Sequence, residues 1–239
     1  IAILSVWAGW GSKGFSHPVS ADAIRDFVAL FPGAAHVISA KDFRYCLLNA
    51  SSAALFGLEH QALLLGKSMQ ELQKTHRRLS RNYLCKSRLD DERVVQNHCV
   101  VKRGEDVFLN CAGFVVVYTR MKIPLLDAQR EVSAILTLIF DQTKQANLQC
   151  LWQMYKQHYS RKKQASEKFL HYFGFCEKTC DELSARETDC LVALQALRVP
   201  KQAAKSLGIA AKTMESHISK IRKKCAYKGV HQILAQFCC

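Results

Sequence analysis

The apolar positions of the chain follow two periods, one typical of strands and one typical of helices, and the strand period is confined to the first 145 residues. A first helix is predicted to begin after Ser20, which can cap it, and to end at Pro32-Gly33. Two short apolar runs with a turn at Lys41-Asp42 follow, then a compact helical stretch and a basic helical segment over residues 70–92.

Three strands are predicted between residues 93 and 143. The runs RVVQNHCVVK, DVFLNCAGFVVVYTRMKIPLL and EVSAILTLIFDQT are rich in β-branched and aromatic residues. Residues 103–106, Arg-Gly-Glu-Asp, predict the hairpin between the first two strands, and residues 124–129 predict the loop before the third. The first part of the chain is therefore expected to be an α+β domain with an antiparallel sheet.

This order of a strand pair, small helices and three long antiparallel strands resembles a PAS sensor domain. The similar stretches are NASSAALFG (49–57), LLGKS (64–68) and Asp141-Gln142-Thr143, which is similar to the Asp-x-Thr that closes many PAS domains. The resemblance covers residues 21–145 and implies a domain that senses a signal or mediates dimerisation. The basic stretch KTHRRLSRNYLCKSR departs from the family's pattern.

Residues 144–173 contain neither Gly nor Pro and predict a helix that leaves this domain. Leu148, Trp152, Tyr155 and Tyr159 recur at spacings of four, three and four. Two interpretations fit this seam: a helix-pair contact in a dimer, or a helix that lies on its own domain. We expect a linker helix over residues 146–180.

The last part of the chain has helical periods only. Ser184 and Glu187 have the spacing of a capping box, Pro200 can stand in the first turn of a second short helix, and Gly208 ends that helix. Thr213 is predicted to cap a third helix. Its apolar stripe consists of Met214, Ile218, Ile221 and Cys225.

The stretch LSARETDCLVAL…KQAAKSLGIAAKTMESHISKIRKKC resembles the LuxR-type helix-turn-helix domain of bacterial transcription regulators, over residues 181–237. The resemblance implies that the polar side of the third helix enters the DNA major groove, with Glu215, Ser216 and Ser219 facing base edges. It also implies phosphate contacts by the flanking basic residues and Thr213. The predicted DNA-binding residues are Lys201, Lys212, Thr213, Glu215, Ser216, Ser219, Lys220 and Lys223. Leu197 and Met214 stand where the family usually has Gly and Val.

The charge of the chain favours a polyanionic partner. The formal net charge is +14, and residues 150–239 hold 16 lysines and arginines against 7 acids. Between Arg198 and Lys228 there are nine basic residues and one acid, Glu215. This excess coincides with the helix-turn-helix resemblance, so we expect double-stranded DNA as the partner.

The eleven cysteines are scattered through apolar runs, and we expect buried thiols without a structural disulfide. His171, Cys176 and Cys180 lack the paired spacing of a zinc site, so no metal is predicted. No cofactor is predicted either. His76 and His98 as axial ligands, and Cys46, Cys85, Cys99 and Cys111 as redox or flavin partners, are less favoured alternatives.

Enzyme activity is not expected, because the sequence has no Gly-rich phosphate loop, H-E-x-x-H or G-x-S-x-G motif. For the N-terminal domain, sensing of a small-molecule ligand and a ligand-free role as a protein-interaction platform both stay open. The apolar start, residues 1–11, is too short for a membrane span and lacks the basic flank of a signal peptide. A cytoplasmic protein without membrane contact is expected.

The sequence therefore predicts a transcriptional regulator that forms a homodimer. Its fold is expected to be α+β, with a PAS-like antiparallel sheet domain joined through the linker helix to an all-α, four-helix LuxR-type helix-turn-helix domain. The expected boundaries are an N-terminal segment over 1–20, the PAS-like domain over 21–145, the linker over 146–180 and the DNA-binding domain over 181–239.

Overall fold

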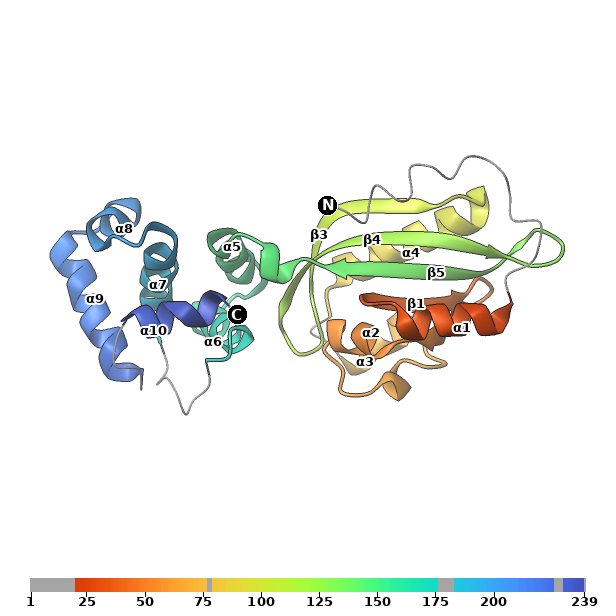
Figure 1. Cartoon of the computed structure of the whole chain (residues 1–239), viewed down its shortest axis with the longest axis horizontal. Helices are drawn as coiled ribbons and strands as arrows, with labels where there is room; N and C mark the ends of the chain where they lie inside the picture. Colours follow the sequence, from red (N-terminus) through yellow and green to blue (C-terminus); the bar gives the residue numbers. More distant parts are fainter. Residues whose placement is uncertain (1–19, 77–78, 176–182, 226–229, 239) are drawn as a thin grey trace.

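The computed structural model of the chain describes residues 20–76, 79–175, 183–225 and 230–238. An α+β domain lies at one end of an elongated molecule and a group of helices at the other, with helices α5 and α6 between them (Figure 1). Most of the N-terminal segment, as well as Cys176, Cys180 and Cys239, lies outside the described residues.

The N-terminal domain is built on a five-stranded antiparallel sheet with the strand order β2-β1-β5-β4-β3. The strands are β1 (Ala34–Ser39), β2 (Tyr45–Leu48), β3 (Val101–Leu109), β4 (Val115–Leu126) and β5 (Val132–Asp141). The last strand is therefore inserted between the first pair and the second pair. This is the PAS-like α+β arrangement that the sequence predicts.

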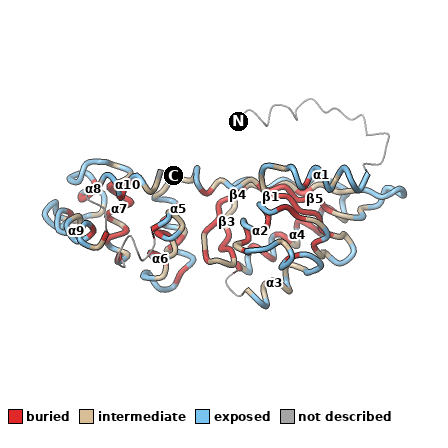
Figure 2. The backbone as a smooth tube through the Cα atoms, turned by 60° about the horizontal axis from the view of Figure 1, so that its bottom comes forward, coloured by how far each residue is buried: buried red, intermediate tan, exposed pale blue. Residues whose placement is uncertain are grey.

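Helices cover both faces of this sheet (Figure 2). Helix α1 (Ala21–Leu30), capped by Ser20 as predicted, packs Val28 onto the outer face. The inner face is covered by α2 (Ala50–Leu55), the 3-10 helix η1 (Gln61–Leu63), α3 (Met69–Thr75) and α4 (Arg81–Asn97). An aromatic core that includes Phe56, Tyr83 and Phe108 fills the space beneath these helices.

The predicted position of the β3–β4 hairpin is wrong. Arg93–Asn97 continue α4, because Val94 is buried one turn after Asp90 and Asp91. Residues 103–106 lie within β3, where the register with β4 shifts, so the Gly-containing sequence forms a bulge instead of a turn. The chain reverses at residues 110–114, where Gly113 has a φ of 84°.

The single linker helix expected over residues 144–173 is also wrong, because the chain forms two helices. The 3-10 helix η2 (Thr143–Gln145) leads into α5 (Leu148–His158), which is followed by α6 (Lys162–Tyr172). Trp152, Tyr155 and Tyr159 are buried inside their own chain against α6 and Val115 and Val117 of β4. The intramolecular interpretation of the seam is therefore confirmed, and the seam is not free for a dimer contact.

The C-terminal part consists of α7 (Ala185–Leu197), α8 (Pro200–Ser206), α9 (Ala211–Lys224), α10 (Val230–Ala235) and the 3-10 helix η3 (Gln236–Cys238). Its apolar core is continuous with that of α5 and α6. We refer to α5–α10 as the helical unit. Ile233 and Leu234 of α10 are buried in this core, so α10 caps the bundle.

Two further observations concern the cysteines and the membrane. Cys225, at the end of α9, is disulfide-bonded, so the expectation of no structural disulfide is wrong at this residue. A disulfide between distant segments depends on the packing of the fold, which sequence spacing alone does not indicate. None of the described helices is long and apolar enough to cross a membrane.

Candidate nucleic-acid interface and N-terminal cavity

Helices α7, α8 and α9 form a helix-turn-helix whose local signals agree with the sequence. Ser184 and Glu187 make the predicted capping box at the start of α7. Pro200 occupies the first turn of α8, where its missing N–H has no partner to lose. Gly208 has a φ of 64° and ends that helix as predicted, and Ile209 packs against the core.

The prediction that Thr213 caps α9 is wrong. The helix begins at Ala211 with Ala210 in the cap position, and no side chain caps it. Thr213 instead stands in the first turn with its side chain exposed. The turn after Gly208 is short, so the cap position is Ala210, three residues before the threonine predicted to cap the helix.

Helix α9 has one buried side and one exposed side. Met214 and Ile221 have no exposed surface, and Ile218 is partly buried against the same core. This is the stripe that the sequence predicts, with Cys225 buried at its end. The packing of this stripe fixes which side of α9 remains in contact with solvent.

All eight residues predicted to contact DNA are exposed: Lys201, Lys212, Thr213, Glu215, Ser216, Ser219, Lys220 and Lys223. Seven of them lie on α9 and Lys201 lies in the first turn of α8. Within the described parts of the chain, none of the four lysines has an ion-pair partner. The structure thus presents them as uncompensated cations around a short polar surface.

A buried ion pair holds the two ends of the helix-turn-helix together. Lys224 Nζ, at the end of α9, donates to Glu187 Oε2 at the start of α7 over 2.8 Å. Burial alone would raise the pKa of Glu187, but the hydrogen bonds from Lys224 and from the Ser184 amide outweigh it, and the pKa is lowered. Glu187 is therefore ionised near neutral pH and anchors α9.

His217 lies between the two sides of α9. It is partly buried, and its buried Nδ1 has no hydrogen-bond partner in the described structure. We assign it no chemistry.

The N-terminal domain contains a cavity of about 700 Å³ between α3, α4 and the sheet. Its floor includes His36 and Ile38 of β1 and Lys122 of β4, and its mouth includes Arg44, Arg81 and Arg88. Asp42, Asp91 and Glu92 also line it. Of the histidines and cysteines considered as cofactor ligands, Cys85 lines this cavity and the other five do not.

A strip of polar residues lies on the inner face of the sheet, and two of its members, His36 and Lys122, line the cavity. Thr137 of β5 is directly opposite His36 on one side and Lys122 on the other, so the three side chains share the inner face of the sheet. All three are buried, and Thr137 Oγ1 has no hydrogen-bond partner among the described residues. Burial lowers the pKa of His36 to about 3, helped by Lys122 and Arg120, so His36 is neutral.

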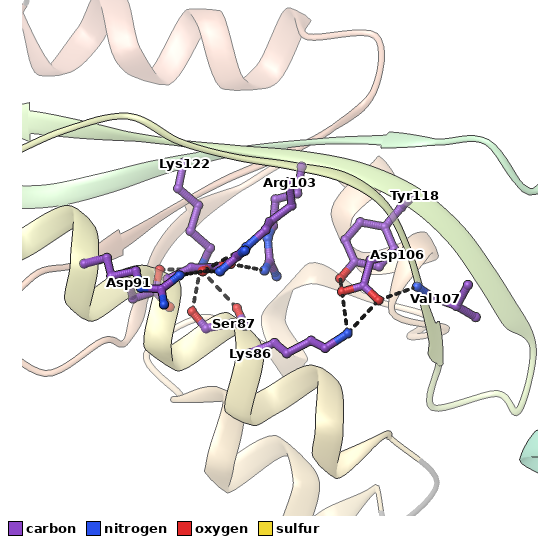
Figure 3. A network of polar contacts seen from close by, with 11 residues as sticks. Lys86, Ser87, Asp91, Arg103, Asp106, Val107, Tyr118 and Lys122 are labelled. Carbon is purple, nitrogen blue, oxygen red and sulfur yellow. Dashed lines mark hydrogen bonds and ion pairs between the residues drawn. The ribbon is translucent and has the colours of Figure 1, made fainter.

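Beside this strip, α4 is joined to the sheet by charged groups (Figure 3). Lys122 Nζ donates to Ser87 Oγ (3.0 Å), to the Ser87 carbonyl (3.1 Å) and to Asp91. Arg120 Nη2 donates to Asp90 over 2.7 Å. Further along α4, Lys86 donates to Asp106 over 3.0 Å.

Burial shifts both members of the Lys122–Asp91 pair toward their neutral forms. Desolvation lowers the pKa of Lys122 to about 8, against the opposing effect of Asp91. Desolvation likewise raises the pKa of Asp91, although Lys122 acts in the opposite direction. The two groups therefore neutralise each other, and the buried site would disfavour any additional unpaired charge.

Sequence reasoning missed this cavity and its charged floor. The signal was present in β4, where Tyr118, Arg120 and Lys122 alternate with Thr119, Met121 and Ile123. Strand alternation places the first set on one face, and only the inner face is covered by α4. Groups of three or more metal-ligating side chains do not occur in the described parts of the chain.

Comparisons with known proteins place this geometry among solved structures of low similarity. No family model and no curated protein matches the chain. A complex of Vibrio cholera VqmA with a ligand and DNA is 18% identical, covers 91% of this chain and 87% of that chain, and has a TM-score of 0.42.

Two further solved structures are similar in the same way. VqmA bound to DPO is 17% identical over 91% of this chain and 86% of that chain, with a TM-score of 0.40. The PAS domain of Bordetella pertussis BvgS is 18% identical over 58% of this chain and 97% of that chain, with a TM-score of 0.44. Because all three scores are below 0.5, the function of this chain is inferred below from its own residues.

Proposed function

We propose that the protein is a DNA-binding transcriptional regulator, in which the exposed side of α9 enters the major groove. The observation that carries this proposal is the pairing of an apolar stripe locked into the core with four lysines that have no partner in the described structure. A helix held in this way can offer polar groups to base edges while flanking cations contact phosphates.

The residues divide into two groups with different expected roles. Glu215, Ser216 and Ser219 present an acceptor and two hydroxyl groups that can bond to base edges. Lys201, Lys212, Lys220 and Lys223, with Thr213, supply phosphate contacts that position the helix without reading sequence. The first group governs which sequence is bound, and the second governs how tightly any duplex is bound.

Selection from random duplexes with the full-length chain, followed by binding measurements across a salt series, tests this proposal. We expect a preferred site, and an affinity that falls with salt with a slope of about 0.9 per phosphate contacted. Ser219→Ala should change the preferred sequence, whereas Lys220→Ala should weaken binding to all duplexes. Salt-independent binding, or no binding by the intact chain, would contradict the proposal.

We also infer that the N-terminal domain senses a small molecule in the cavity between α3, α4 and the sheet. The polar lining of the cavity supports this interpretation, because His36, Ser87 and Lys122 place hydrogen-bonding groups on a buried wall. These groups can supply donors and acceptors for a ligand. Apart from Arg81 at the mouth, the charged lining residues pair within the protein, so the inferred ligand is an uncharged molecule with hydrogen-bonding groups.

Three probes of equal size distinguish ligand classes: benzamide, benzoate and benzamidine. If the inference holds, ligand-detected NMR will show more saturation transfer to benzamide than to benzoate or benzamidine. Of the two charged probes, benzoate should receive more, because Arg81 lies at the mouth of the cavity. Cys85→Phe, which fills part of the cavity from an exposed position of α4, should reduce the transfer and leave the stability nearly unchanged. Unchanged transfer in Cys85→Phe, or no transfer from any probe, would favour the ligand-free interaction platform.

A homodimer completes the proposed function, since two-fold regulators bind paired half-sites. Helix α1, on the outer face of the sheet, supports it: Phe27 and Leu30 are exposed apolar residues there, and Leu30 is 83% exposed. Light scattering of the full-length chain should give twice the chain mass of 27.0 kDa. Leu30→Glu should shift the equilibrium to the monomer, and a monomeric wild-type chain at micromolar concentration would contradict the dimer.

A further inference from the structure

The turn between β3 and β4, residues 110–114, is held on both sides by groups from distant parts of the chain. On the side of the N-terminal core, the Cys111 amide donates to the carbonyl of Phe56 (2.9 Å). On the other side, Tyr159 Oη donates to the carbonyl of Gly113 (2.5 Å) and Lys168 Nζ to that of Ala112 (3.0 Å). The turn therefore touches α2's end and the α5–α6 pair at once.

There is no free space on either side of this turn. A Cβ atom on Gly57 would lie 2.7 Å from the Ala112 amide nitrogen, and one on Gly113 would lie 2.6 Å from Tyr159 Oη. Both glycines have positive φ, 71° and 84°. Close backbone approach of this kind transmits a displacement, because tightly packed groups cannot absorb it locally.

The contact with Phe56 connects the turn to the cavity. The Phe56 ring is fully buried and packs against His36 and Tyr45, with ring centroids 6.1 and 6.4 Å apart. His36 and Tyr45 both line the cavity. A molecule that moves either ring therefore presses on Phe56, whose carbonyl holds the Cys111 amide.

The contacts with α5 and α6 connect the turn to the helix-turn-helix. Trp152 Nε1 and Lys156 Nζ donate to Asp189 of α7 over 2.7 and 3.2 Å. Ser166 Oγ of α6 lies 2.5 Å from Thr188 Oγ1, within the same continuous apolar core. A rotation of α5 and α6 is therefore also a rotation of α7.

We propose that the turn 110–114 couples the cavity to the orientation of the DNA-binding helices, with Tyr159 and Lys168 as its positioning residues. The effect on DNA binding rests on the proposed function, whereas the coupling between the cavity and the helices rests on the contacts described above. The covalent connection through η2, together with the packing of α5 on Val115 and Val117, attaches the helical unit along β4. The turn supplies a second attachment beside it, and two attachments fix an orientation that the cavity can bias.

A double-mutant cycle read by hydrogen exchange of the full-length chain tests the coupling. Tyr159→Phe and Lys168→Met remove the bonds to the turn, and Lys163→Met, an exposed lysine of the same helix, is the matched control. Cys85→Phe fills part of the cavity, and Cys85→Met repeats the cycle with a smaller group. The readout is the exchange of α5 and α6 amides, which involves no DNA.

We expect Tyr159→Phe to speed the exchange of these amides about fivefold, as for one lost hydrogen bond. Cys85→Phe should change the exchange of the same amides by severalfold in the wild-type turn and in Lys163→Met. That response should disappear in Tyr159→Phe and Lys168→Met. Additive effects would overturn the proposal, because independent distant sites add. Intact coupling in a chain that fails to bind DNA would instead contradict the proposed function alone.

Discussion

The two ends of the molecule use charge in opposite ways. The N-terminal domain buries Asp90, Asp91, Arg120 and Lys122 and pairs them with one another beneath α4. In the described part of the helical unit, the buried charged side chain is Glu187, and the lysines of α8 and α9 predicted to contact DNA are exposed.

This difference separates two kinds of recognition. Paired charges in a dry interior stabilise little by themselves, but they keep polar groups next to a cavity that apolar packing would fill. Unpaired cations on a surface are favourable only when an anion neutralises them. The N-terminal interior is therefore suited to a small uncharged molecule, and the surface of α9 to an extended polyanion.

The largest effect should come from breaking a buried pair. Asp90→Asn leaves the Arg120 guanidinium without its carboxylate in a buried site, and should lower the free energy of unfolding of the N-terminal domain by about 3–5 kcal/mol. Urea denaturation followed by circular dichroism measures this. Asp22→Asn, at an exposed position, is the control.

Replacing both partners of the Asp91–Lys122 pair tests whether the pair itself stabilises the fold. Asp91→Leu combined with Lys122→Met should be nearly neutral or stabilising, since no unpaired charge is left. A loss as large as that of Asp90→Asn would mean that the pair itself stabilises the fold.

A smaller effect is expected at the surface of α9. Lys212→Ala, Lys220→Ala and Lys223→Ala should each lower the salt slope of DNA binding by about 0.9 and leave the unfolding midpoint unchanged. Fluorescence anisotropy at several salt concentrations measures the slope. Lys41→Ala, an exposed lysine of the N-terminal domain, should change neither quantity.

The Glu187–Lys224 pair should make the stability of the helical unit depend on pH, which the surface lysines should not. Because the pKa of Glu187 is lowered by folding, its contribution is present above its unfolded pKa and is lost as the pH falls through the folded value. The thermal midpoint of the helical unit should therefore fall below about pH 4. Glu187→Gln should remove part of that decrease, and an identical pH profile in both proteins would contradict this.

The smallest effect concerns Arg198, which ends α7 with a φ of 58°. A side chain in this left-handed region is strained by about 1 kcal/mol, and glycine is not. Arg198→Gly should raise stability by about 0.5 kcal/mol in chemical denaturation. Arg198→Ala retains the Cβ atom and should give no gain.

The sequence predicted those parts of the fold that depend on local chemistry. The caps at Ser20 and Ser184, Pro200 in the first turn of α8 and the stripe of α9 are all determined within a few residues. The eight candidate DNA-binding residues are exposed as the stripe requires, although their contact with DNA stays a prediction.

What the sequence did not predict depends on contacts between distant residues. The Arg103–Asp106 stretch has the composition of a turn, but pairing with β4 makes it a bulge. The break between α5 and α6 contains neither Gly nor Pro, and it forms where Tyr159 bonds to Gly113, 46 residues away. The cavity floor combines residues of β1 and β4, and only the sheet order, with β5 between these strands, brings them together.

The shared core of α5–α6 and α7–α9 has a consequence for how such a protein can be divided or recombined. A fragment that begins at residue 181 would expose the apolar surface that Trp152 and Phe169 cover, and would be prone to aggregate. A cut before Asn147 leaves that surface covered. Gene fusions that exchange one N-terminal domain for another would therefore succeed only when the two helices before α7 travel with the DNA-binding half.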